Sequence, residues 1–226
     1  MAKISCIIPA YNEGPLIAGV LNAVSGHPLI NEIIVVDDGS KDDSGEIIRK
    51  FKDVKLLVNE KNMGKSYAVA KGIAEANGEI IFLLDADLIG LTPQNISEII
   101  EPVFSKKVDI SISLRGNVPW FIKMLKFDYL SGDRVFPKEF VQSHLEKIQK
   151  LPPFGLEVFL NELIIKNKCR VKIVFWPQVI SLLKFKKRSF WTGIKDEILM
   201  NRDIFKVVSL REIIYQNIKL NSLRIK

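Results

Sequence analysis

Two aspartates directly after an apolar run are the residues in this sequence best placed to do chemistry. Asp85 and Asp87 are separated by Ala86 and follow the segment Ile-Ile-Phe-Leu-Leu. Two carboxylates this close repel each other at a strand end unless a cation lies between or beside them. Mg2+ and Mn2+ prefer such oxygen ligands and complete their coordination with substrate phosphates. The pair therefore predicts a divalent metal that neutralises the charge developing on a diphosphate leaving group.

Two more polar clusters follow other β-like runs. The first consists of Pro9, Ala10, Tyr11, Asn12 and Glu13. The second consists of Asp37, Asp38, Gly39 and Ser40. Turn chemistry, which favours Asp, Asn and Gly, is enough to explain any one cluster. Ligands of open α/β sheets lie outside the carboxyl ends of the strands, so three clusters at that edge indicate a binding site.

Gly64 and Lys65 open a predicted helix after the third β-like run. A helix N-terminus with a lysine suits a phosphate group. The alternative is that Lys65 is a solvated residue of the first turn. The glycine spacing of a Walker A loop is missing, and no Gly-x-Gly-x-x-Gly follows the first run. These absences argue against a P-loop and against a nicotinamide-binding site.

The elements that must position these residues alternate along the first half of the chain. Short β-branched runs cover residues 4–9, 32–36, 54–58, 80–84 and 108–114. Helical patterns cover residues 14–25, 44–51, 64–76 and 93–104. Thr92 and Pro93 suit the start of the last helix, and Gly78 is expected to end the third. This alternation predicts an α/β fold of Rossmann type, a mostly parallel sheet with helices on both faces.

The second half is less regular. Helices are predicted at 120–125, near Pro137 and at 156–166, and a strand is predicted at 170–176. The tail is expected to be helical from about Thr192. The simplest division is one nucleotide-sugar and acceptor domain at 1–178, followed by a basic, aromatic, mainly helical extension at 179–226.

The ordered motifs of the first half resemble those of family 2 glycosyltransferases, which have the GT-A fold. They are Ile7-Ile8-Pro9-Ala10-Tyr11-Asn12-Glu13, Val35-Val36-Asp37-Asp38-Gly39-Ser40, Asn62-x-Gly64-Lys65 and Leu84-Asp85-Ala86-Asp87. The resemblance implies that the nucleoside is held by Pro9, Tyr11, Glu13 and Asp38. It also implies that Lys65 and Asp85 lie near the nucleotide and that Asp87 holds the metal. Ala10, Asn12, Gly64 and Ala86 are assigned to the same nucleotide-sugar site.

The second half is more distantly similar to glucosyl-3-phosphoglycerate synthase-type members of that family. The similar segments are Ser131-Gly132-Asp133-Arg134 and Phe154-Gly155-Leu156-Glu157. The resemblance implies that Glu157 lies by the acceptor, and that a histidine after the next strand completes the metal site. Residues 178–188 contain no histidine. Either phosphates and water complete the coordination of Mg2+ or Mn2+, or metal binding is weakened.

An inverting transfer needs a base that takes the proton of the acceptor hydroxyl, and Asp133 and Glu157 are the two candidates. The alternatives are that Asp133 stabilises a turn and that Glu157 interacts with a helix dipole. Arg134 is expected to bind a carboxylate or phosphate on the acceptor. Its alternative is a solvated surface charge.

The formal charge of +7 favours anionic partners. Residues 182–191 place lysine and arginine beside leucine, phenylalanine and tryptophan, a pattern that suits an anionic membrane surface and a polyprenyl-phosphate acceptor. A core-packing segment with a basic edge is the alternative. The chain has no recognised nucleic-acid-binding module, so nucleic acid is not expected.

Cys6 and Cys169 lie in or beside apolar runs and are predicted to be buried thiols in a reducing compartment. The sequence shows neither a secretory signal nor an apolar run of about 20 residues. We therefore expect a cytoplasmic protein, with contact to the inner membrane face through the tail.

The sequence thus predicts a metal-dependent, inverting glycosyltransferase that uses a nucleotide-diphosphate sugar and a small-acid or polyprenyl-phosphate acceptor. One alternative is a nucleotidyltransferase, but that class is expected to carry a glycine-rich basic loop where this chain has Pro-Ala-Tyr-Asn-Glu. The other is a degenerate sugar-nucleotide-binding or membrane-surface protein without turnover, which the missing histidine keeps open.

Overall fold

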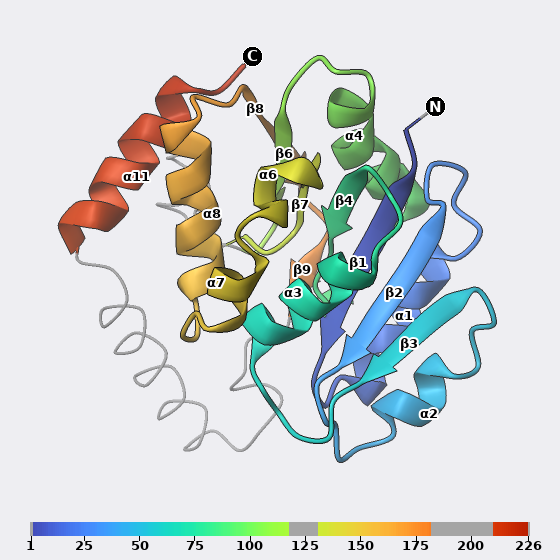
Figure 1. Cartoon of the computed structure of the whole chain (residues 1–226). Coiled ribbons are helices and arrows are strands. Elements are labelled where there is room, and N and C mark those ends of the chain that lie inside the picture. Colours follow the sequence, from blue (N-terminus) through green and yellow to red (C-terminus); the bar gives the residue numbers. More distant parts are fainter. Residues whose placement is uncertain (1, 118–130, 182–209, 226) are drawn as a thin grey trace.

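The computed structural model describes residues 2–117, 131–181 and 210–225. The helix predicted at 120–125, the basic segment 182–191 and the predicted helix start near Thr192 lie outside these residues. Within them the chain forms one large sheet with helices on both faces (Figure 1). The described residues contain no helix with the length and apolar character needed to cross a membrane.

The first half follows the predicted alternation of strands and helices. Its elements are β1 (Ile4–Ala10), α1 (Gly14–Val24), β2 (Glu32–Asp37), α2 (Ser44–Ile48), β3 (Val54–Val58), α3 (Lys65–Glu75), β4 (Ile80–Leu83), β5 (Leu88–Ile89), α4 (Pro93–Phe104) and β6 (Ile110–Arg115). Thr92 caps α4 as expected, because its side chain accepts the backbone N–H of Asn95. The expected role of Gly78 is wrong. Helix α3 ends at Glu75, and Gly78 is needed elsewhere, since a Cβ there would lie 2.6 Å from the backbone nitrogen of Ser5.

The second half adds shorter elements. They are β7 (Arg134–Pro137), α6 (Glu139–Gln142), α7 (Leu145–Gln149), α8 (Gly155–Lys166), β8 (Val171–Trp176), β9 (Ile180–Ser181) and α11 (Leu210–Ser222). Strand β7 was not predicted. It has four residues and ends in a proline, a composition that argues against a central strand. Its proline stands at the last position, so the ladder in front of it stays intact.

The strands of the large sheet run in the order β3-β2-β1-β4-β7-β6-β8. All neighbouring pairs are parallel except the two that involve β7, which is antiparallel to both β4 and β6. A small antiparallel pair of β5 and β9 lies outside this sheet. The predicted α/β fold with a mostly parallel sheet is confirmed.

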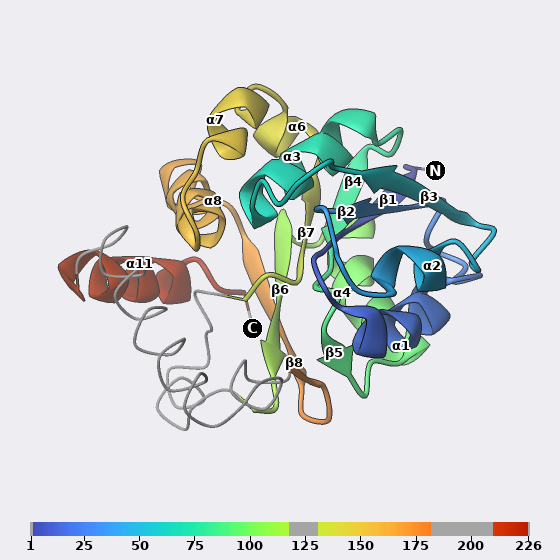
Figure 2. The same ribbon diagram turned by 90° about the horizontal axis from the view of Figure 1, so that it is seen from below.

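Side chains from each strand alternate between two apolar cores. Ile7 and Ile81 pack with α3, α6, α7 and α8 on one face, whereas Cys6, Ile8 and Phe82 pack with α1, α2 and α4 on the other. Figure 2 shows these two helix layers on opposite sides of the sheet. Burial on both faces explains why these strands are apolar throughout. Each fully buried isoleucine contributes about 1.5–3 kcal/mol relative to an exposed one.

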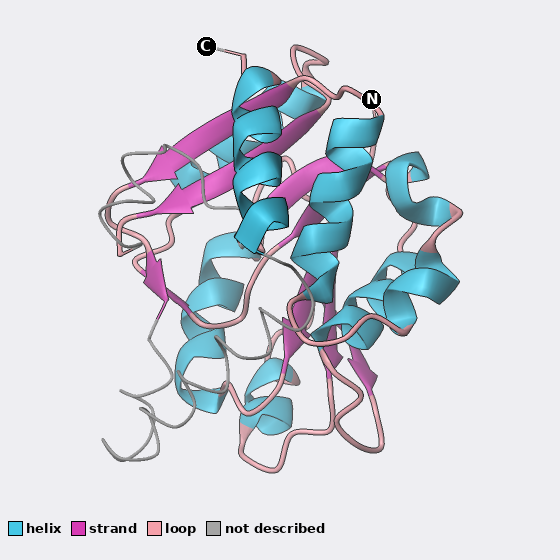
Figure 3. Cartoon of the chain, turned by 90° about the vertical axis from the view of Figure 1, so that its left-hand side faces the viewer, coloured by secondary structure: helices cyan, strands magenta, loops and turns pink. Residues whose placement is uncertain are grey.

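The described parts of the predicted extension contact the rest of the chain. Helix α11 lies beside α8 (Figures 1 and 3), and Leu220 is buried in the same core as Ile7. Arg224 forms a bridge with Val171 at the start of β8. The division at residue 178 stays a prediction.

Both cysteines are buried and free, as predicted. Burial raises the pKa of the Cys169 thiol to about 11, and it raises the pKa of Cys6 even further. Burial therefore disfavours the thiolate form of both cysteines at neutral pH.

Candidate active site

The strand directions bring distant segments to one edge of the sheet. Strands β1, β2, β4 and β6 all end there, and because β7 runs the opposite way, the residues that precede β7 lie at the same edge. The acidic loop after β4 therefore faces Arg115, the last residue of β6, and Asp133, which stands just before β7.

The two aspartates of the acidic loop do not point into the core. Ala86 between them is buried with Leu88 in the core, while Asp85 and Asp87 are partly exposed. Ala86 and Asp87 form a turn between β4 and β5, in which Ala86 is buried and the two aspartates are not. The carboxylates are thus available at the sheet edge.

A chain of ion pairs with alternating charge crosses this edge. Lys65 Nζ lies 2.7 Å from Asp85 Oδ1 and 2.8 Å from Glu157 Oε1. Arg115 pairs through Nη2 with Asp85 Oδ2 and donates from Nε to Asp133 Oδ2 at 2.9 Å. The members in order are Glu157, Lys65, Asp85, Arg115 and Asp133. We call these five residues the charge chain.

The ion pairs favour the charged forms of Asp85 and Lys65. Burial would raise the pKa of Asp85, but Lys65 and Arg115 outweigh this effect and hold that pKa well below its usual range. Burial would likewise lower the pKa of Lys65, but the carboxylates of Asp85 and Glu157 raise it well above its usual range. Three carboxylates against two cations leave one negative charge in excess.

Asp133 is fully buried and surrounded by donors. Its Oδ2 accepts from Arg115 Nε and from Ser113 Oγ, each at 2.9 Å, and its Oδ1 accepts the backbone N–H of Asp85 at 3.0 Å. It therefore orients Asp85 through the backbone while it neutralises Arg115. The alternative that Asp133 only stabilises a turn does not account for these contacts with Arg115 and Asp85.

Gly132 lies against the centre of the charge chain. A Cβ at this position would lie 2.5 Å from Lys65 Nζ and 2.6 Å from each carboxylate oxygen of Asp85. Its φ is not positive, so a side chain here would displace Lys65 and Asp85 without straining the backbone.

The loops after β1 and β2 are tied to each other. Asn12, with a φ of 55°, donates its backbone N–H to Ser40 Oγ at 2.9 Å and accepts from the backbone of Lys41 at 2.8 Å. The backbone N–H of Glu13 donates to Ser44 Oγ at 2.9 Å. Tyr11 is exposed between them, whereas Pro9 and Ala10 belong to β1. Tyr11 is thus the residue of this run best placed to meet a ligand.

Asp38 organises the approach to α3. It is buried, and its carboxylate accepts the backbone N–H groups of Met63 and Gly64 and the side-chain amide of Asn59. Gly64 has a φ of 96°, a conformation that favours glycine, and it directly precedes Lys65. Asp38 therefore links the end of β2 to the position of the lysine in the charge chain.

Arg134 is buried, so the alternative of a solvated surface charge is wrong. Its Nε donates to the backbone oxygen of Ser131 and its Nη1 to Asn161 Oδ1, both at 2.8 Å. Its predicted contact with an acceptor stays a prediction.

Arg115 is the residue of this site that sequence reasoning missed. It stands in Ser-Leu-Arg-Gly-Asn, without an acidic neighbour or a recognised motif. Its place at the end of a predicted strand was a usable signal, because the other clusters were found by that same criterion.

The metal prediction rests on few protein ligands. The parts of the chain that the structure describes hold no group of three or more His, Cys, Asp or Glu side chains suited to a metal. Burial would lower the pKa of Arg115, but Asp133, Asp85 and Asp87 raise it, so the Asp87 carboxylate lies near the charge chain. Oxygen donors of this kind suit Mg2+ or Mn2+ when phosphates supply the remaining ligands.

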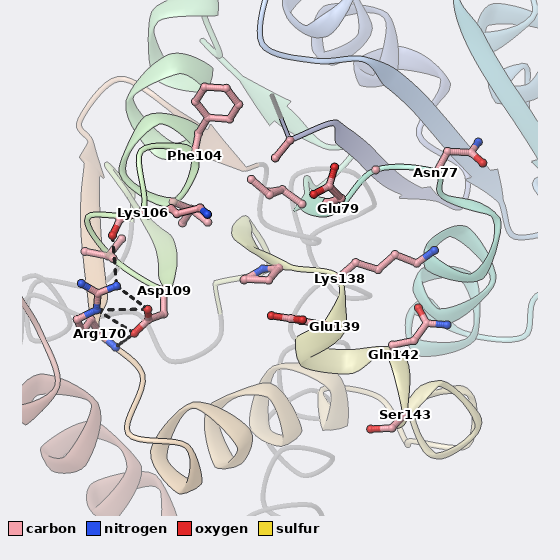
Figure 4. Close-up of a pocket in the computed structure, with 16 residues that line it drawn as sticks. Asn77, Glu79, Phe104, Lys106, Asp109, Lys138, Glu139, Gln142, Ser143 and Arg170 are labelled. Carbon is pink, nitrogen blue, oxygen red and sulfur yellow. Dashed lines mark hydrogen bonds and ion pairs between the residues drawn. The ribbon is translucent and has the colours of Figure 1, made fainter.

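A hollow of about 900 Å3 lies at the opposite edge of the sheet (Figure 4). Ala2, Ile80 and Arg170, at or just before the starts of β1, β4 and β8, are among the residues that line it. Figure 4 shows Lys138 and Glu139 on one side of it and the Arg170–Asp109 pair on the other. None of the predicted site residues lines this hollow.

Known proteins share this fold and these motifs. A crystal structure of glucosyl-3-phosphoglycerate synthase from Mycobacterium tuberculosis, with Mn2+, UDP-glucose and phosphoglyceric acid, matches with a TM-score of 0.71 and 22% identity. The match covers 92% of this chain and 79% of that chain. This likeness shows that the fold is the expected GT-A-like one.

Two curated relatives give closer sequence matches over shorter spans. The dolichol-phosphate mannosyltransferase of Pyrococcus furiosus is 32% identical over 192 residues, which cover 74% of this chain and 53% of the relative. The uncharacterized glycosyltransferase YaiP of Escherichia coli is 41% identical over 88 residues, 37% of this chain and 22% of the relative. This chain thus spans about a fifth to a half of the curated relatives it matches.

The family model described as Glycosyl transferase family 2 matches residues 5–126, more than half of the chain. This span contains the loops after β1, β2 and β4, the start of α3 and the end of β6. The chain belongs to glycosyl transferase family 2.

Proposed function

We propose that this chain is a metal-dependent, inverting glycosyltransferase that moves a sugar from a nucleotide-diphosphate sugar to a hydroxyl or phosphate acceptor. The observation that carries the proposal is the charge chain at the carboxyl edge of the sheet, with Asp87 beside it. The excess negative charge there opposes an approaching diphosphate unless a divalent cation accompanies it. A carboxylate site that accepts a diphosphate only together with a metal matches the predicted chemistry.

The donor would lie across the ends of β1, β2 and β4. The exposed ring of Tyr11 stands where the nucleoside is expected, and Lys65 at the start of α3 reaches toward the diphosphate. Asp87 would hold the metal, because both carboxylate oxygens of Asp85 are already engaged by cations. When bound, Mg2+ or Mn2+ would stabilise the negative charge that builds up on the departing diphosphate.

Both candidate bases are buried, but their hydrogen-bond partners differ. Asp133 has no exposed surface and accepts three hydrogen bonds, so an acceptor hydroxyl has no route to it. The Glu157 side chain is 6% exposed and accepts from Lys65, whose side chain is 39% exposed and borders the ligand edge of the sheet. We therefore assign the base to Glu157 and the orientation of Asp85 to Asp133.

The transfer step follows from these roles. Glu157 takes the proton of the acceptor hydroxyl while the acceptor oxygen bonds to the anomeric carbon. The bond from that carbon to the diphosphate oxygen breaks on the opposite side, and the diphosphate leaves with the electron pair. Lys65 is held between base and diphosphate, so it balances charge on both. Attack opposite the leaving group inverts the anomeric configuration.

Two acceptor classes remain in the proposal. Solved relatives were crystallised with phosphoglyceric acid, and curated relatives include the dolichol-phosphate mannosyltransferase and a dodecaprenyl-phosphate galacturonate synthase of Rhizobium johnstonii. Both classes are anionic, which suits the formal charge of +7. A polyprenyl-phosphate acceptor would place the protein at an anionic membrane surface.

A donor screen tests the proposal. Sugar nucleotides of UDP and GDP are incubated with Mn2+ and either small-acid or polyprenyl-phosphate acceptors, and products are identified by mass spectrometry. We expect transfer with one donor, and its loss in Asp87→Ala and after chelation. Asp53→Ala, which removes an exposed aspartate elsewhere, is the matched control. Full activity of Asp87→Ala would defeat the assignment.

Binding without turnover is the second candidate function. It is favoured by the lack of a histidine in residues 178–188 and by the small set of protein ligands in the described residues. Calorimetric titration with UDP and GDP, with and without Mn2+, separates the two candidates. Metal-dependent nucleotide binding together with a blank in every transfer assay would establish the second.

A further inference from the structure

The backbone that carries Arg115 is anchored independently of the charge chain. Arg115 pairs in register with Trp176 of β8, and Gly116 donates its backbone N–H to the oxygen of Val179 at 3.0 Å. A Cβ at Gly116 would lie 1.9 Å from the backbone oxygen of Pro177, so the two segments are in close contact. These contacts hold the backbone of Arg115 in place, so the position from which its guanidinium extends is fixed.

The guanidinium closes a ring of contacts around Asp85. Arg115 Nη2 pairs with the Asp85 carboxylate and Nε with the Asp133 carboxylate, while Asp133 accepts the backbone N–H of Asp85. Asp85 is thus held both at its backbone and at its side chain. The planar fork of arginine suits two carboxylates at once, whereas a lysine ammonium acts as a point charge.

The two cations of the charge chain differ in exposure. The Lys65 side chain is 39% exposed and can reach a ligand, whereas the Arg115 side chain is 10% exposed and lies among carboxylates. We propose that Arg115 is a positioning residue, which fixes the Asp85 carboxylate so that Lys65 and the donor diphosphate meet it in one geometry. This inference rests on the proposed function.

Nucleotide binding by two variants tests it. Arg115→Lys keeps the charge and loses the fork. The double variant Arg115→Gln/Asp133→Asn removes one cation and one carboxylate, which keeps the net charge and protects the fold. Arg170→Lys, in the exposed Arg170–Asp109 pair, is the matched control. Dissociation constants for UDP and GDP are measured by calorimetry with saturating Mn2+, beside the unfolding midpoint of each protein.

We expect both Arg115 variants to bind the nucleotide about 10–100-fold more weakly, a loss of the size seen when a partner that orients a metal ligand is removed. The control should bind like the wild type. In the transfer assay the donor KM should rise while the acceptor KM stays unchanged, a split that a general loss of packing does not produce. If folded Arg115→Lys and the double variant both bound the nucleotide with wild-type affinity, this inference would be overturned. The proposed function would not be affected by that result. Failure of the wild type to bind either nucleotide would overturn the proposed function, and the inference with it.

Discussion

An arginine–aspartate contact lies at each end of strand β6. The two contacts join the same residue types but differ in how far their side chains are exposed to solvent. At its carboxyl end, Arg115 contacts Asp85 and Asp133, with side-chain exposures of 10%, 17% and 0%. Beyond its amino end, Arg170 pairs with Asp109, with exposures of 51% and 39%. Water screens the exposed pair, so it contributes little, whereas a buried charge without its partner is costly. An ion pair identified from residue types alone therefore says little about stability or function.

Removal of Asp133 should have the largest effect on stability. Asp133→Ala leaves the buried guanidinium of Arg115 with one partner fewer, and we expect a loss of about 3–5 kcal/mol in the free energy of unfolding. Urea denaturation measures this loss. The same change at the opposite end, Asp109→Ala, should leave the denaturation midpoint nearly unchanged. Equal losses of unfolding free energy in Asp133→Ala and Asp109→Ala would contradict the proposed difference between the buried and the exposed ion pair.

Loss of the carboxylate of Glu157 should separate binding from chemistry. Glu157→Gln removes the proposed base, so we expect transfer to a hydroxyl acceptor to fall about 10²–10⁴-fold. Lys65 also loses a carboxylate that competes with the diphosphate, and nucleotide binding should therefore be unchanged or tighter. Single-turnover rates and calorimetric dissociation constants on the same protein measure both. Weaker binding in this variant would contradict the assigned role.

A methyl group at Gly132 should perturb the charge chain directly. Gly132→Ala places a Cβ against Lys65 and Asp85, and we expect a destabilisation of about 1–3 kcal/mol together with weaker nucleotide binding. Gly19 in α1 has no atom within 4 Å of its would-be Cβ. Gly19→Ala should instead stabilise the protein by about 0.5–1 kcal/mol, because alanine favours a helix. Thermal unfolding of both variants compares them.

The smallest effect is expected at the exposed pair. Arg170→Gln should change neither the unfolding midpoint nor nucleotide affinity, since both members of the pair are already solvated. Denaturation curves at low and high salt check this, because screening removes what little the pair contributes. A marked loss of nucleotide affinity in Arg170→Gln would show that the Arg170–Asp109 pair influences the binding site at the opposite edge of the sheet.

Local sequence was sufficient for most of the scaffold. β-Branched runs and helical periodicity predicted the strands and helices of the first half, because a strand buried on both faces must be apolar throughout. The polar loops that follow those strands were also predicted. Strand β7 was missed, since four residues that end in Pro137 carry too weak a pattern to indicate a central strand.

The sequence by itself determined the fold class and the family, and it predicted Asp85, Asp87 and Lys65 as site residues, because each stands in a motif that follows a recognisable element. Only the tertiary structure decided that Arg115 joins them, that Asp133 is buried among donors, and that Glu157 contacts Lys65. The physical reason is that burial and ion pairing at the sheet edge depend on strand order and register. The antiparallel β7 brings together segments far apart in the chain, and no local pattern records that pairing.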